Sequence, residues 1–326
     1  MLKLQGIRLA EGAAPLDHEF RSGQITVVLG RNRSGKTRLC RLLAGLEPTG
    51  EGRILLDGVD VSNIPAGQRP VSFVYQSFVN YPTLTVAENI ASPMRARGLP
   101  SRERRRRVED LAARLHISEL LDRRPAQLSG GQQQRLAIAR ALAKQARVLV
   151  MDEPLVNLDF KLREALELEL RGLLRDAGIA VVYTSSDPRD AFNLGDEVLL
   201  LADHAPVQAG RPLDVYERPV SVAAADLMSD PGVNLLPGPD RPAAIRPEHL
   251  HVSRHARDDE TFAAELLTLE TNGSETYLHC RVADAHWVVK LEGLIDLKLR
   301  PGDTLPLFAE QRSLLRFSEA MTDVQD

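Results

Sequence analysis

The sequence has few of the features that mark secreted or membrane-spanning chains. Its 326 residues include only two cysteines, Cys40 and Cys280, which form no CxxC or zinc-type spacing. That usage fits a reducing compartment in which thiols stay inert. The longest uninterrupted aliphatic run is Val198 to Ala202, and no apolar signal core follows Met1. A bilayer-spanning helix needs about 20 apolar residues, so we expect any membrane role to be peripheral.

A strong excess of one charge is also missing. The formal net charge is −4 and the sequence pI is about 6.1. Nucleic-acid-binding domains usually carry a basic excess, so we expect no nucleic-acid partner. The one dense basic stretch, Arg102–Arg107, precedes Val108, Leu111, Ala112 and Leu115, which fall at helical spacing. We interpret the arginines as the solvated face of that helix, with a nucleic-acid or lipid surface as the alternative.

The most informative stretch is a glycine-rich loop between a β-branched run and a helical pattern. Residues 30–37 read GRNRSGKT, which matches G-x-x-x-x-G-K-T, and an apolar strand pattern from Ile25 precedes them. Glycines let backbone N–H groups face anionic oxygens, and the helix N-terminus adds partial positive charge. We predict that Lys36 reaches the β- and γ-phosphates and that Thr37 ligates Mg²⁺. The predicted phosphate-binding residues are Gly30, Arg31, Asn32, Arg33, Ser34, Gly35, Lys36 and Thr37.

Strand and helix patterns alternate along most of the chain. Strands are expected at 52–58, 71–76, 147–152, 179–184 and 197–201, and helices at 128–144 and 159–175. Such alternation predicts crossover units and a mostly parallel sheet, an α/β fold. Ligands of such sheets sit at the carboxyl ends of strands, where Gly30 and Asp152 both fall.

The C-terminal part follows a different pattern. Proline and glycine accumulate at residues 234–242, which marks a linker. Short β-type runs follow, such as Thr276–Val282 and His286–Leu291, separated by turn residues. We therefore expect a small all-β, barrel-like domain after the linker.

Further candidate residues accompany the phosphate loop. Asp152 ends a buried apolar strand and is placed to hold Mg²⁺, and Glu153 to polarise or deprotonate the attacking water. The alternative for two acids at a strand end is a helix cap. Gln76 ends another strand and could sense Mg²⁺ and the γ-phosphate. The segment Leu-Ser-Gly-Gly-Gln opens a helix and could clamp phosphate with its N-terminus, through Ser129, Gly130, Gly131 and Gln132.

Together these motifs resemble the ATP-binding-cassette (ABC) ATPases over nearly the whole chain. The stretches 153–163, 234–238 and 245–250 look like carbohydrate-importer ATPases with a C-terminal oligonucleotide-binding-type (TOBE-like) regulatory barrel. The resemblance implies an ATPase domain at 1–234, with a helical subdomain at about 80–130 and an antiparallel β subdomain, and a regulatory β-barrel at 235–326. It also implies ATP and Mg²⁺ as cofactors, and a dimer in which each phosphate loop faces the other subunit's Ser129-Gly-Gly-Gln.

The implied partners are a second ATPase subunit, two membrane permease subunits and, indirectly, a periplasmic binding protein. The chain would then sit peripherally at the cytoplasmic face of the inner membrane. Residues 74–93 look closest to an ATPase subunit of bacterial glycerol importers. In the family this segment touches the permease coupling helices, so it tracks partner identity. Glycerol is therefore the expected substrate, although this chain itself never touches it.

The departures from the family pattern concern the ATP site. Glycine usually stands where this chain has Arg33, a hydroxyl where it has Arg38, and serine where it has Val156. The switch histidine is replaced by Ser186, which is too short to act at the γ-phosphate and carries no tunable charge. No aromatic residue precedes Phe20 that could stack on adenine. These departures predict a degenerate site in a heterodimer, where this chain's signature completes the partner's site.

Two other interpretations stay open. The chain could be a silent regulatory or structural subunit that binds ATP without turnover, which the missing histidine favours and Asp152-Glu153 disfavours. A cassette ATPase of DNA repair or translation would need a basic surface or a second cassette, and the sequence has neither.

Overall fold

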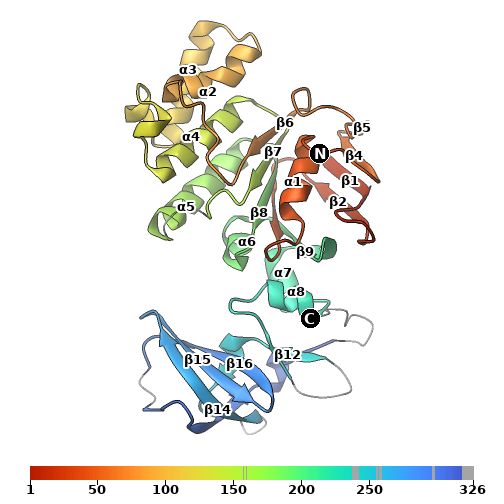
Figure 1. The fold of residues 1–326 in the computed structure, drawn as a ribbon, viewed down its shortest axis with the longest axis vertical. Coiled ribbons are helices and arrows are strands. Elements are labelled where there is room, and N and C mark those ends of the chain that lie inside the picture. The colour runs from red at the N-terminus through yellow and green to blue at the C-terminus, as the bar shows by residue number, and fades with distance from the viewer. Residues whose placement is uncertain are drawn as a thin grey trace. The chain divides into compact units, whose positions relative to one another are not determined.

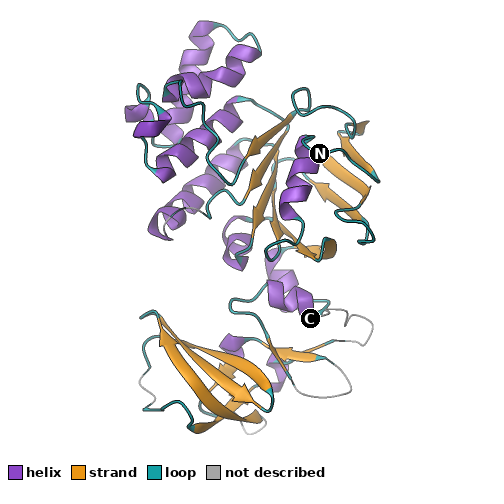
Figure 2. Ribbon diagram, viewed as in Figure 1, coloured by secondary structure: helices purple, strands orange, loops and turns teal. Residues whose placement is uncertain are grey.

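A computed structural model describes residues 1–156, 158, 160–236, 242–254, 256, 259–295 and 298–317; for 160–162, 165 and 168 it describes the backbone alone. The chain divides into two compact units, Met1–Leu213 and Asp214–Asp326. Figures 1 and 2 show a mixed α/β arrangement in the first unit and mostly strands in the second. None of the helices within the described ranges has the length and apolar character needed to cross a bilayer.

A six-stranded sheet forms the centre of the first unit. Every residue of three of its strands is buried, as expected for a parallel sheet covered by helices: β3 (Ile25–Leu29), β7 (Val148–Asp152) and β8 (Ala180–Ser185). Only β10 runs antiparallel to its neighbour. The order is β10 (Ala205–Gly210), β9 (Glu197–Ala202), β3 (Ile25–Leu29), β8 (Ala180–Ser185), β7 (Val148–Asp152) and β6 (Val71–Val74). The predicted parallel sheet is confirmed.

A second, antiparallel sheet covers the first helix from the other side. The helix α1 (Lys36–Ala44) lies between the two sheets in Figure 1. Leu39 and Leu43 of α1 are fully buried and share one apolar cluster with Leu4 of the antiparallel sheet and Val150 of the parallel one. This packing fixes the start of α1 at the edge where the phosphate loop lies. The antiparallel order is β2 (Leu16–Phe20), β1 (Leu2–Ile7), β4 (Arg53–Leu56) and β5 (Val59–Asp60).

The middle of the first unit is helical, as the sequence predicts. It comprises α2 (Val86–Ala96), α3 (Ser101–Arg114), η1 (Ser118–Leu120), η2 (Pro125–Gln127) and α4 (Gly130–Ala143). The basic stretch lies on α3, where Arg102, Arg105 and Arg106 are exposed while Val108 and Ala112 are buried. The expected amphipathic helix is thus present. Two further helices, α5 (Phe160–Asp176) and α6 (Pro188–Leu194), flank strand β8 along the chain.

The second unit is an antiparallel β structure with its own core. Trp287 is fully buried there with Leu266, Leu278 and Leu307, and its indole N–H donates to the carbonyl of Leu235 at 3.0 Å. Five strands form the larger sheet, in the order β13 (Leu250–His251), β17 (Thr304–Ala309), β14 (Glu260–Thr271), β15 (Glu275–Val282) and β16 (Ala285–Glu292). This confirms the predicted all-β domain.

Smaller elements complete this unit. A three-stranded sheet has the order β11 (Asn234–Leu235), β12 (Ala243–Ile245) and β18 (Leu315–Arg316). The short helices are α7 (Pro212–Glu217), which begins at the end of the first unit, α8 (Val222–Leu227), η3 (Pro247–His249) and η4 (Gln311–Ser313). Of the predicted linker, residues 237–241 lie outside the described part of the chain.

Candidate nucleotide site

The phosphate loop spans the turn from β3 into α1, as the sequence predicts. The amide of Gly30 donates to the carbonyl of Ser185 at 3.2 Å, which ties the loop to the neighbouring strand β8. A Cβ atom on Gly30 would lie 2.5 Å from the carbonyl oxygen of Leu201 and closer still to the hydroxyl of Ser34. Gly35 adopts φ 101°, a region that favours glycine. Both glycines are therefore required by the backbone path.

Lys36 lies at the centre of this loop and is almost fully buried. Its Nζ donates to the carbonyls of Gly30 and Arg31 at 2.7 and 2.9 Å, and lies 3.2 Å from Oε1 of Glu153. Only 4% of the Lys36 side chain is exposed. The ammonium group is thus held at the mouth of the loop by groups that a triphosphate could partly replace.

A set of hard oxygen atoms lies beside the lysine. The hydroxyls of Thr37 and Thr184 both donate to Oδ1 of Asp152, at 3.2 and 3.0 Å. Burial raises the pKa of Asp152, and the two hydroxyl donors oppose that rise. Such carboxylate and hydroxyl oxygens are the ligands that Mg²⁺ prefers.

The loop also offers a donor for an anion. The hydroxyl of Ser34 is buried and has no hydrogen-bond partner within the described structure. A bound phosphate would give this hydroxyl an acceptor. The residues therefore fit Mg²⁺-ATP: Asp152 and Thr37 would hold the cation, and residues 30–37 the phosphates. Bound Mg²⁺ would supply charge neutralisation of the phosphate oxygens.

Glu153 directly follows β7 and has a strained backbone. Its φ is 42°, in the left-handed region that glutamate rarely adopts. Its amide donates to the hydroxyl of Thr184 at 2.9 Å. Thr184 is therefore hydrogen-bonded to both Asp152 and Glu153. Such strain concentrates where a side chain must be aimed. The sequence analysis missed Thr184; the available signal was its place at the end of β8, paired in register with Asp152.

Ser186, at the position predicted to correspond to the switch histidine, lines a cavity that Glu153 also lines. This cavity has a volume of about 20 Å³, and Thr184 lines it too. Ser186 is exposed, and its short side chain leaves this cavity without an imidazole. Gln76 is also exposed and follows β6, whose carboxyl end lies beside that of β7. Phe20 is fully buried, so its own ring is not open to an adenine base.

The signature segment forms a helix cap. The hydroxyl of Ser129 accepts from the amide of Gln132 at 3.4 Å, and the Gln132 side chain accepts from the amide of Ser129 at 3.0 Å. This reciprocal capping box begins α4. Ser129 and Gly130 are exposed, whereas Gly131 is buried. Ser129 and Gly130 are therefore accessible to a second chain. The action of this segment on a partner's ATP stays a prediction.

Arg33 gives a prediction that rests on backbone strain. It has φ 68°, where a non-glycine residue costs about 1–2 kcal/mol. We expect Arg33→Gly to leave the fold intact and to raise the free energy of unfolding by up to about 1 kcal/mol, since glycine's larger unfolded-state entropy offsets part of the relief. Urea denaturation measures this. A loss of stability beyond about 1 kcal/mol, the entropic cost of glycine, would show that the Arg33 side chain makes stabilising contacts.

These features define the chain as a member of the ABC transporter family, as one of its ATP-hydrolysing subunits. Residues 14–156 match the family described as "ABC transporter", and residues 243–317 match the "TOBE domain". The predicted family and C-terminal domain type are thereby confirmed.

Individual relatives agree with this assignment. The chain is 34% identical to the sn-glycerol-3-phosphate import ATP-binding protein UgpC of Bordetella bronchiseptica, over 94% of this chain and 92% of the relative. It is 36% identical to the xylose/arabinose import ATP-binding protein XacK of Haloferax volcanii, over 80% and 76%. Among solved structures, a dimeric ATP-binding cassette bound to ADP and Pi is 26% identical, with a TM-score of 0.57, over 65% of this chain and 99% of that one.

Proposed function

We propose that this chain is the ATP-binding subunit of an ABC importer for a sugar or polyol, with glycerol as the transported molecule. The observation that carries the ATPase function is the group formed by Lys36, Glu153, Asp152 and Thr37 at the carboxyl edge of the parallel sheet. The import function is supported by relatives named as import ATP-binding proteins. Glycerol is supported by residues 74–93, which resemble the corresponding segment of glycerol-importer ATPases.

A groove beside residues 74–93 supports docking to permease subunits. Its volume is about 410 Å³, and Phe73, Tyr75, Tyr81 and Pro93 line it. Tyr81 is 48% exposed and Tyr75 37%. Exposed aromatic side chains that line a groove are typical of sites that receive a helix from a partner. Two permease subunits at the cytoplasmic face of the membrane, fed by a periplasmic binding protein, would complete the importer, and the chain is peripheral to that membrane.

The degenerate ATP site and the heterodimer form the finer part of the proposal. They rest on Arg33, on Ser186 and on the lack of an aromatic residue before Phe20, and the comparisons do not bear on them. In a heterodimer, the partner's phosphate loop and histidine would combine with this chain's Ser129–Gln132 in one working site. We assign the ATPase function to residues 1–234 and a regulatory function to residues 235–326. The silent-subunit alternative differs only in that no site containing this chain turns over ATP.

The role of the signature segment is tested with Ser129→Arg. The longer cationic side chain would fill the space that a partner's phosphates need, while Ser129 lies outside the chain's own phosphate loop. We expect cells that carry this variant to lose uptake of radiolabelled glycerol, while the purified variant still binds Mg²⁺-ATP like the wild type. If wild-type cells take up labelled sn-glycerol 3-phosphate and not labelled glycerol, the proposed substrate is wrong and sn-glycerol 3-phosphate takes its place. Loss of ATP binding by the variant itself would place the segment in the chain's own pocket.

A further inference from the structure

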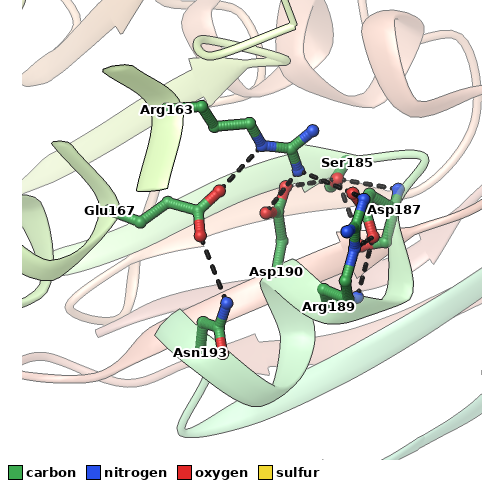
Figure 3. A network of polar contacts seen from close by, with 7 residues as sticks. All are labelled: Arg163, Glu167, Ser185, Asp187, Arg189, Asp190 and Asn193. Carbon is green, nitrogen blue, oxygen red and sulfur yellow. Dashed lines mark hydrogen bonds and ion pairs between the residues drawn. The ribbon is translucent and has the colours of Figure 1, made fainter. Parts of the chain in front are cut away.

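A partly buried polar network at the edge of the predicted site joins helix α5 to the turn that carries Ser186. Figure 3 shows Arg163 and Glu167, both from α5, facing Ser185, Asp187 and Asp190 around the end of β8 and the start of α6. Arg163 Nη2 lies 2.7 Å from Oδ1 of Asp190 and 3.0 Å from Oδ2 of Asp187. Its Nε lies 2.7 Å from Oε1 of Glu167. One guanidinium thus contacts three carboxylates.

The network holds the turn on both sides of Ser186. On one side, the hydroxyl of Ser185 donates to Oδ2 of Asp190 at 2.5 Å and accepts from the amide of Asp187 at 2.9 Å. On the other side, Asp187 caps α6 by accepting from the amide of Arg189 at 3.0 Å. Ser186 itself stays exposed between these two fixed neighbours.

The network depends on the positive charge of Arg163, which lies among several acidic groups. Around it lie the carboxylates of Glu167, Asp187 and Asp190 and the phenol of Tyr183, with Arg189 as the second cation, paired with Asp187. Burial raises the pKa of Asp190 to about 6 in spite of Arg163. Without the guanidinium, three acids would be left close together in a partly buried place, which strongly disfavours the arrangement.

Arg163 also reaches the site itself. It lines the cavity of about 20 Å³ that Glu153 and Ser186 share. Helix α5 begins at Phe160, shortly after Glu153 in the sequence, and Arg163 of this helix pairs with Asp187 and Asp190, which follow Ser186. From this placement we infer that Arg163 is a positioning residue, which fixes the turn at position 186 relative to Glu153. The inference rests on the proposed ATPase function of that site.

The inference is tested first without nucleotide. Arg163→Ala should make the backbone amides of residues 185–187 and 189–194 exchange with deuterium about 10-fold faster, the effect of losing one charge-assisted hydrogen bond. Arg175→Ala is the matched control, because Arg175 lies on the same helix and pairs with Asp196, outside the network. Equal exchange of these amides in the two variants would overturn the inference. This measurement involves no ATP, so its outcome is independent of the proposed function.

Turnover provides the second test, in a chain that also carries Ser186→His. There, Arg163→Ala should lower kcat by about 10²-fold and leave ATP affinity unchanged, because a misplaced turn affects the reaction and not the phosphate loop. Arg163→Lys keeps the charge but lacks the planar fork, so it should restore part of kcat. If Arg163→Ala does not fold, Arg163→Lys and Asp190→Asn are compared by the same exchange measurement. Unaltered exchange in both would refute the positioning role.

Discussion

Replacing Lys36 by alanine is expected to abolish measurable binding of Mg²⁺-ATP to the purified chain. The ammonium group is buried at the mouth of the phosphate loop, with Glu153 as its ionic partner. Its removal takes away the cation nearest to the phosphates and leaves Glu153 as an unpaired charge beside them. Truncating one partner of a buried, hydrogen-bonded charge pair at a binding interface typically costs about 2–5 kcal/mol, which corresponds to a loss of roughly 30-fold to several thousand-fold in affinity.

A lysine outside the phosphate loop provides the control for Lys36→Ala. Lys290→Ala also removes a lysine from an ion pair, since Lys290 lies 2.8 Å from Glu275, but that pair is in the second unit, so the variant should leave ATP affinity unchanged. Isothermal titration calorimetry with both variants measures the difference, and circular dichroism checks that each is folded. An unchanged affinity of Lys36→Ala would refute the assignment of residues 30–37 as the ATP site.

Much of the fold was predictable because its signals are local in the sequence. The phosphate loop combines a β-branched strand, two glycines with special backbone requirements and a helix start within thirteen residues, 25–37. The buried strand before Asp152 and the alternation of strands with helices then predict the parallel sheet. They also predict the edge of that sheet where the phosphate loop and Asp152 meet. The all-β C-terminal domain followed equally from short β-type runs after the linker.

The contacts within the site were less predictable, because they join distant segments. Thr184 contacts Asp152 only because β7 and β8 pair in a particular register. The left-handed φ of Glu153 is set by the surrounding packing, and glutamate gives no local signal for it. The network around Arg163 likewise depends on how α5 packs against α6. In each case the tertiary arrangement, which one sequence does not display, decides the contact.

The serine at position 186 underlies the second large prediction. We expect the wild-type chain to hydrolyse ATP slowly by itself, since one missing group at such a site costs about 10²–10³ in rate, by analogy with oxyanion-hole donors. Ser186→His should raise kcat by a similar factor, because an imidazole at this exposed position would enter the cavity that Glu153 lines. Ser186→Ala should leave the low rate unchanged, and neither variant should alter ATP affinity.

The central claim is that this chain has an impaired ATP site but an intact signature segment. The measurement that tests it most directly is ATP turnover by the chain as the sole ATPase subunit assembled with the proposed permeases, with and without the proposed second ATPase subunit. The account predicts slow turnover by the chain alone, which the second subunit or Ser186→His restores. Full, substrate-stimulated turnover by the wild-type chain alone, not increased by Ser186→His, would contradict it and would show that Glu153 acts here without a histidine.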